Sequence, residues 1–260
     1  MTVDQYLQNV LFQKEAIFYP GIINQLSPVI KQWGNSYVDE IFQAGSSAKG
    51  TAIKGKSDSD IFISINHSCK ISMSELFYSL TNYLISLFGK SCVRKQNVSV
   101  GLKFDGYNVD LVPGKRQSDN TNYHCIYKSK KGTWTQTNVK YQIKHILNSG
   151  CANHIKLVKI WRDCHGLDFP SVNIELAVLD ALKYQKRNML LSNDFIAILK
   201  YFSANLKDAR LVDISNSNNI ISDDMTTEEK YKIAKCACSC LDHRLQEIIW
   251  YTNFHIERRA

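Results

Sequence analysis

The segment of residues 45–65 limits the possible folds of this chain more than any other part of the sequence. It opens with Gly45-Ser46, continues through Lys49-Gly50-Thr51, and ends in the apolar run DIFISI that begins at Asp60. Such a run of branched apolar residues, bounded by turn residues, predicts a buried strand. A Gly-Ser turn before a strand leaves backbone N–H groups and a hydroxyl available for phosphate oxygens. The segment therefore predicts a mixed α/β region with an anion-binding turn.

Three carboxylates belong to this region. Asp58 and Asp60 open the predicted strand one residue apart, and alternation along a regular strand would put both on one face. Asp110 lies among apolar residues in a second predicted strand, where an unpaired charge is costly. A divalent cation would relieve the repulsion among them, and oxygen ligands beside a nucleotide phosphate favour Mg²⁺, with Mn²⁺ as a second choice. The arrangement suits two-metal phosphoryl transfer. Asp105, which precedes Gly106, is expected in a solvated hairpin turn.

The two halves of the chain differ in their hydrophobic pattern. Strand-like runs fall at residues 37–42, 60–65, 97–104 and 108–112, with a helix predicted at 73–88 and an earlier one at 3–33, broken near Pro20 and Gly21. Helical patterns then follow at 137–147, 153–164, 171–185, 192–206 and 227–254. The sequence predicts an α+β architecture with two closely packed domains, at residues 1–135 and 136–260.

Composition narrows the setting. The chain has 260 residues, 44% of them hydrophobic, and a formal net charge of +8, which favours anionic ligands. We find no apolar run of membrane-spanning length and no signal-peptide pattern, so we expect a cytoplasmic protein with no membrane partner. The eight cysteines are then expected as reduced thiols.

A zinc site on the cysteine-rich segment is disfavoured by its spacing. The candidate ligands are Cys236, Cys238, Cys240 and His243. On a helix, seven residues span roughly 10 Å, which separates Cys236 from His243 too far to share one ion. Only neighbouring pairs could bind, together with residues from elsewhere.

The order Gly-Ser, Lys-Gly-Thr, Ser-Asp-x-Asp and a distant strand with Val-Asp resembles the DNA polymerase β type of nucleotidyltransferases. Within that superfamily the chain is most similar to the branch of 2′-5′-oligoadenylate synthase, cyclic GMP-AMP synthase and the bacterial cyclic-oligonucleotide synthases of antiphage defence. The resemblance implies a nucleotidyltransferase palm fused to a C-terminal helical bundle, with NTP and Mg²⁺ in the cleft between them. It implies attack of a ribose hydroxyl on the α-phosphate of an NTP, with release of pyrophosphate.

The same resemblance implies roles for individual residues. Asp58 and Asp60 would hold both metals, and Asp110 the metal that activates the hydroxyl. Gly45, Ser46 and nearby amides would bind the β and γ phosphates. The helix containing Lys159 resembles the one whose lysine meets the triphosphate.

Two further residues follow from the pattern of the helical half. Lys159 falls off the predicted buried stripe of Leu157, Ile160, Trp161 and Cys164, and would be free to reach a cleft. Ser171 resembles a serine that faces phosphates in the family, although it is equally a candidate N-cap.

The product is expected to be a cyclic di- or oligonucleotide made from ATP and other NTPs, because 260 residues leave no room for a polymer-holding appendage. The alternatives are an RNA-directed enzyme of the CCA-adding or poly(A) type, and a silent nucleotidyltransferase-like binding protein. A nucleic acid or protein activator is compatible with the sequence.

Overall fold

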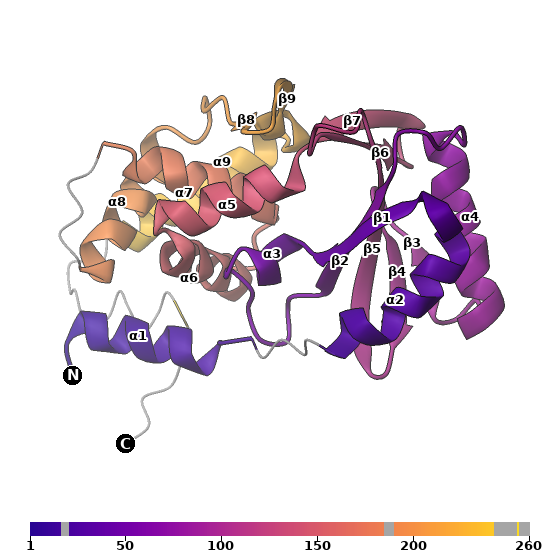
Figure 1. Ribbon diagram of the computed structural model, residues 1–260. Helices are drawn as coiled ribbons and strands as arrows, with labels where there is room; N and C mark the ends of the chain where they lie inside the picture. The colour runs from indigo at the N-terminus through magenta and orange to yellow at the C-terminus, as the bar shows by residue number, and fades with distance from the viewer. Residues whose placement is uncertain (17–20, 185–189, 242–253, 255–260) are drawn as a thin grey trace. The chain divides into compact units, whose positions relative to one another are not determined.

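The computed structural model describes residues 1–16, 21–184, 190–241 and Phe254 (Figure 1). The chain forms two compact units, which we call the sheet unit and the helical unit. The sheet unit comprises Ile17–Gly50 and Lys56–His145, and the helical unit Met1–Ala16, Thr51–Gly55 and Ile146–Ala260. The backbone therefore passes twice between the units within the motif-bearing segment.

The sheet unit is built on a seven-stranded mixed sheet. Its central path runs in the order β1-β2-β5-β4-β3, while β6 pairs with β5 and β7. Strands β2 and β5 are parallel, and the remaining pairs are antiparallel. The strands are β1 (Val38–Gln43), β2 (Ser59–Ile65), β3 (Val93–Lys95), β4 (Val100–Phe104), β5 (Tyr107–Arg116), β6 (His124–Lys128) and β7 (Thr133–Thr137).

Helices α2 (Gly21–Gly34) and α4 (Met73–Phe88) cover this sheet (Figure 1). Their apolar faces share one core with β2, β4 and β5, which includes Ile30, Leu80 and Ile63. A capping box fixes the start of α4. The Ser72 side chain accepts a hydrogen bond from the Glu75 backbone N–H, and the Glu75 side chain accepts one from the Ser72 backbone N–H. The short helices η1 (Asn35–Tyr37) and α3 (Gly45–Ala48) flank β1.

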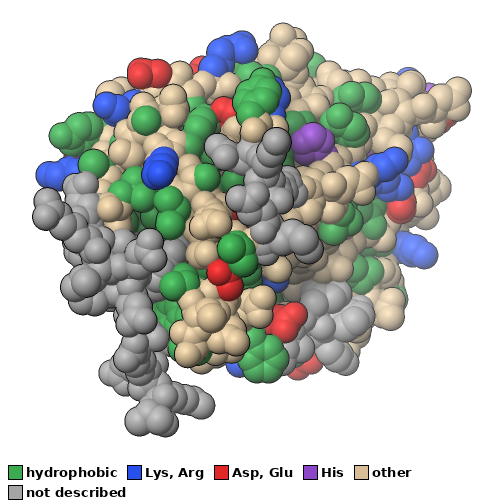
Figure 2. Space-filling view, turned by 90° about the vertical axis from the view of Figure 1, so that its left-hand side faces the viewer, with side chains coloured by type: hydrophobic (Ala, Val, Ile, Leu, Met, Phe, Trp, Pro, Cys, Tyr) green, Lys and Arg blue, Asp and Glu red, His purple; other side chains and the backbone are tan. Residues whose placement is uncertain are grey.

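The helical unit packs around Trp161, which is fully buried. Its helices are α1 (Val3–Gln13), the end of α5 (Val139–Ser149), α6 (Ala152–Cys164), α7 (Ser171–Leu182), α8 (Leu191–Ala204) and α9 (Thr227–Leu241). It also contains the hairpin of β8 (Val212–Asp213) and β9 (Asn216–Ile220), and the short helix η2 (Ile221–Asp224). Figure 2 shows one face on which basic, acidic and apolar side chains are interspersed.

The predicted α+β class and most predicted elements are present, with two differences. Strands β3, β6 and β7 fall where no strand was expected. The two compact units do not coincide with residues 1–135 and 136–260, because α1 packs its apolar face into the helical unit's core. The expected break near Pro20 and the end of the 227–254 helix, with His243, lie outside the described residues.

None of the helices among the described residues combines the length and apolarity needed to cross a bilayer.

Candidate active site

The parallel pairing of β2 and β5 places Asp60 directly opposite Asp110. Residues that face each other across neighbouring strands point to the same side of the sheet, so both carboxylates lie on one face. Asp58 lies in the loop that ends one residue before β2, rather than in a regular strand as expected. Its charge nevertheless acts on both Asp60 and Asp110. The structure therefore gathers the three carboxylates that the sequence singled out.

The turn that contains Gly45 packs directly on the Asp60 side chain. Gly45 has a φ of +58°, and a Cβ at this position would overlap the Asp60 carboxylate. The backbone N–H of Ser46 donates to that carboxylate, and the N–H of Ala44 donates to the Asp60 carbonyl at 2.8 Å. Glycine is required here on two counts, its left-handed backbone and the close approach of the carboxylate. The expected phosphate contacts of Gly45 and Ser46 stay predictions.

The pKa values of the carboxylates are those expected of a cation site without its cation. Burial, followed by the charges of Asp110 and Asp58, raises the pKa of Asp60 to about 6. Lys49 and the Ser46 backbone N–H act in the opposite direction. Burial and then Asp58 also raise the pKa of Asp110. A site whose carboxylates resist ionisation in the absence of metal is stabilised when a divalent cation binds.

Two residues of this site were missed by the sequence analysis. Arg94 on β3 pairs with the Asp58 carboxylate at 3.2 Å, and Gln96 donates to Asp110 Oδ1 at 2.8 Å. Ser99 in turn donates to Gln96 Oε1 at 3.0 Å. These contacts hold two of the three carboxylates in place. The polar sequence of β3 and the following turn contains no signal that would have identified them.

Lys159 belongs to the helical unit and is buried, contrary to the expectation that it lies off the packed face of α6. Only 3% of its surface is exposed. Its ammonium group donates to the Thr51 carbonyl oxygen at 3.1 Å and lies 3.2 Å from Thr51 Oγ1. The structure thus connects Lys159 to the Lys-Gly-Thr part of the motif. A contact with a triphosphate stays a prediction.

Ser171 is also in the helical unit, as the first residue of α7. The alternative that Ser171 is the N-cap is wrong, because Pro170 occupies the cap position and makes no side-chain cap hydrogen bond. The Ser171 hydroxyl accepts a hydrogen bond from Arg162 at 3.4 Å. Its predicted contact with phosphate is not tested by the structure.

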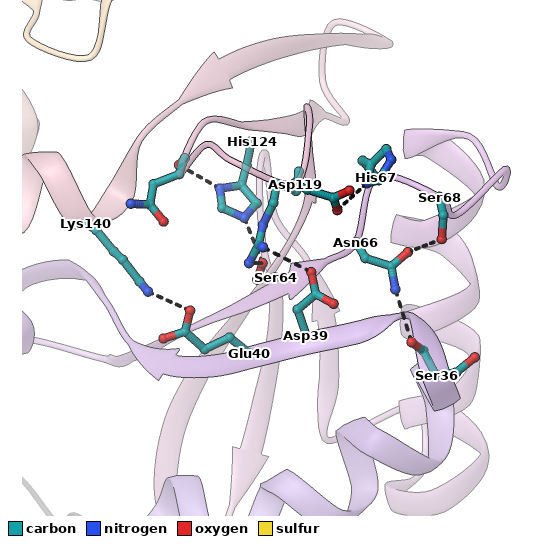
Figure 3. Close-up of polar contacts among 12 residues, drawn as sticks. Ser36, Asp39, Glu40, Ser64, Asn66, His67, Ser68, Asp119, His124 and Lys140 are labelled. Atoms are coloured by element: carbon teal, nitrogen blue, oxygen red, sulfur yellow. Dashed lines mark hydrogen bonds and ion pairs between the residues drawn. The ribbon is translucent and has the colours of Figure 1, made fainter.

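A second polar cluster lies at the other end of β2 and β5 (Figure 3). Ser64 Oγ lies 2.8 Å from His124 Nε2, a pairing that resembles a nucleophile and its base. Both residues are buried, with 0% and 3% of their surface exposed, so a substrate could not reach the serine hydroxyl. Lys140 and Glu40 form an ion pair at 2.6 Å nearby. We assign this cluster to holding strands β1, β2 and β6 together.

The donor set of the carboxylate site fits a hard divalent cation. Its ligand atoms are carboxylate oxygens, which suit Mg²⁺ and Mn²⁺ rather than softer ions. The mutual charge effects among the three aspartates, and the glycine that makes room for Asp60, are the observations that support this fit.

A mixed sheet that presents three aspartates beside a Gly-Ser turn defines the polymerase β-type nucleotidyltransferases. Comparison with known proteins is more specific. Residues 21–149 match the family described as the Second Messenger Oligonucleotide or Dinucleotide Synthetase domain. Residues 21–149 thus form a domain of this family, whose members are nucleotidyltransferases that make cyclic oligonucleotides. The predicted family and enzyme class are confirmed.

Solved structures of bacterial synthases share the fold over nearly the whole chain. E. coli CdnC with ATP is 17% identical, with a TM-score of 0.78, and the alignment covers 97% of this chain and 98% of that one. Bradyrhizobium diazoefficiens CdnG with GTP is 14% identical, with a TM-score of 0.74 and coverages of 98% and 96%. Another structure holds E. coli CdnC in complex with HORMA-deltaN, at 17% identity, a TM-score of 0.77 and 96% coverage of both chains. These likenesses confirm the polymerase β-like fold. A search of the curated proteins gives no match.

Proposed function

We propose that the chain is a Mg²⁺-dependent synthase that joins NTPs into a cyclic di- or oligonucleotide second messenger and releases pyrophosphate. The observation that carries this proposal is the cluster of Asp58, Asp60 and Asp110 packed against the Gly45-Ser46 turn. Removing any of the three would leave the cation site short of a ligand. The family assignment argues against the RNA-directed and the silent alternatives.

In this mechanism Asp58 and Asp60 would hold both metal ions, and Asp110 would help to hold the ion that activates the attacking hydroxyl. Bound Mg²⁺ would lower the pKa of that hydroxyl and neutralise charge on the phosphates. The Gly45-Ser46 turn orients Asp60, while Gln96 and Arg94 orient Asp110 and Asp58. The ribose hydroxyl of one nucleotide then attacks the α-phosphate of another. The bond between that α-phosphate and the leaving pyrophosphate breaks.

Cyclisation repeats the same step within a linear intermediate and consumes its 5′-triphosphate. The product should therefore resist phosphatase, and it should form from free NTPs without an RNA primer. Incubation with four labelled NTPs and Mg²⁺, followed by phosphatase treatment and chromatography, tests this. Activity that appears only with RNA, with all label retained on the RNA, would contradict the proposal.

The cellular role we propose is antiphage defence in the cytoplasm. The solved complex of E. coli CdnC with HORMA-deltaN supports the proposal that a protein partner activates this chain. A host that carries the wild-type gene should survive phage challenge better than one that carries the Asp60→Asn variant. Equal survival would separate the enzymatic activity from the proposed role.

A further inference from the structure

A second group of metal-binding side chains lies in the helical unit, where α6 ends beside α9. His165 is the residue that ends α6, and Cys236 and Cys240 lie four residues apart on α9. One ligand atom from each of the three lies within 4.8 Å of the other two. No local spacing links this cysteine pair to the histidine, because His165 lies 71 residues before Cys236 along the chain.

The spacing of these atoms is close to that of a tetrahedral zinc centre. With Zn–S distances of about 2.3 Å and Zn–N distances of about 2.0 Å, ligand atoms stand about 3.5–3.8 Å apart. Cys240 Sγ already lies 3.9 Å from His165 Nε2. Residues four apart share one face of a helix, so both thiols point toward the imidazole. Small side-chain rotations would complete the geometry.

The surroundings favour bound thiolate. The indole N–H of Trp161 donates to Cys240 Sγ at 3.5 Å, and a hydrogen bond of this kind fixes and stabilises a metal-bound sulfur. Cys240 is only 9% exposed, whereas Cys236 is partly open to solvent. An ion could therefore enter past Cys236 and be held against the buried Trp161.

We propose that His165, Cys236 and Cys240 bind one Zn²⁺, with water as the fourth ligand. Thiolate sulfur and imidazole nitrogen are the ligands that zinc prefers, which distinguishes this site from the all-oxygen aspartate site. Each thiol releases a proton on binding, and His165 binds as neutral imidazole. The ion would tie α9 to the end of α6, the helix that carries Lys159.

The test uses the full chain, stripped with a chelator under a non-thiol reductant and titrated with Co²⁺ without nucleotide. We expect one Co²⁺ per chain with a thiolate-to-cobalt charge-transfer band and the visible bands of tetrahedral cobalt, both lost when Zn²⁺ is added. Carboxylate-bound Co²⁺ has no such charge-transfer band, so this readout is independent of the aspartate site.

Variants assign the ligands. Cys236→Ser and Cys240→Ser should each lose at least half of the charge-transfer intensity, and His165→Gln should weaken cobalt binding. Cys238→Ser is the matched control, because Cys238 is exposed on the same helix between the two proposed ligands. Far-UV circular dichroism identifies any variant that fails to fold, and the remaining ones then decide.

The proposal is wrong if wild-type protein shows no charge-transfer band. It is also wrong if either Cys236→Ser or Cys240→Ser keeps the full intensity of the band, or if Cys238→Ser lowers the intensity equally.

Discussion

Asp60→Asn should stabilise the protein in the absence of metal while it abolishes synthesis. In the wild type, burial and the charges of Asp110 and Asp58 raise the pKa of Asp60 from 3.8 to about 6. That difference corresponds to a decrease of about 3 kcal/mol in the free energy of unfolding when Asp60 ionises. Asparagine keeps the size of the side chain and the acceptor for the Ser46 N–H, but removes the charge.

The effect should depend on pH in a defined direction. A carboxyl whose pKa is higher in the folded than in the unfolded state binds its proton more tightly when folded. The wild type therefore loses stability as pH rises from about 4 to about 6, whereas the variant does not lose this contribution. The variant should be more stable by about 3 kcal/mol near pH 7.5 and by about 1 kcal/mol near pH 4.5.

Hydrogen exchange of the β2 and β5 amides, measured with chelator present, reports the opening free energy of the sheet unit alone. Asp105→Asn is the control, because Asp105 is an exposed carboxylate in the β4–β5 turn of the same unit. Its substitution should give the same small change at both pH values. An Asp60→Asn protein that is less stable than the wild type near pH 7.5, or whose advantage does not grow with pH, would refute the reasoning.

Three further variants test other parts of the site. Gly45→Ala should abolish turnover by displacing a catalytic carboxylate. Gly132→Ala is the control, because Gly132 has a similar φ of +64° and open space for a Cβ, so this substitution should incur only the left-handed backbone cost of about 1–2 kcal/mol. Equal turnover in the two variants would contradict this reasoning. Asp110→Ala should lose turnover yet keep NTP binding. Calorimetry with a non-hydrolysable NTP and Mg²⁺ measures the binding, and loss of binding together with turnover would disprove this prediction. Lys159→Ala should weaken NTP binding about 10- to 150-fold and also lower the melting temperature, since it releases Thr51. An unchanged affinity with a lowered melting temperature would leave Lys159 with a purely structural role.

Local sequence signals predicted some elements accurately. The predicted helix at 73–88 has the same ends as α4, because Ser72 and Glu75 form its capping box and Gly89 follows its last turn. The hairpin at Asp105-Gly106 was also predicted, and both residues have positive φ, as a two-residue turn requires. In these cases residues within one turn of each other determine the structure.

Elements that depend on distant partners were missed. Strand β7 reads TWTQT, with Trp134 62% exposed, so no buried apolar alternation marks it. It becomes a strand because β6 pairs with it, and β6 itself pairs with β5. Arg94 and Gln96 reach the aspartates for the same reason, through the pairing of β3 with β4.

The prediction for Lys159 failed for a different physical reason. An apolar stripe shows which residues are exposed only on a helix that buries a single face. Helix α6 instead has seven buried residues between His154 and Trp161. Apolar periodicity therefore does not separate buried from exposed positions on this helix. The partner of Lys159, Thr51, is 108 residues away in sequence, so no local pattern could reveal the contact.

The Gly45-Ser46 turn and the aspartates form one site, because the turn holds Asp60 in position. The aspartates repel one another, which a bound cation would relieve, and fixed contacts hold them in position against that repulsion. Gly45 and the Ser46 N–H supply those contacts for Asp60, as Gln96 does for Asp110. A phosphate seated on the same turn would therefore lie beside the carboxylate that holds its metal. On the proposed function, the spacing of the motif places the phosphate site and the cation site on one backbone turn.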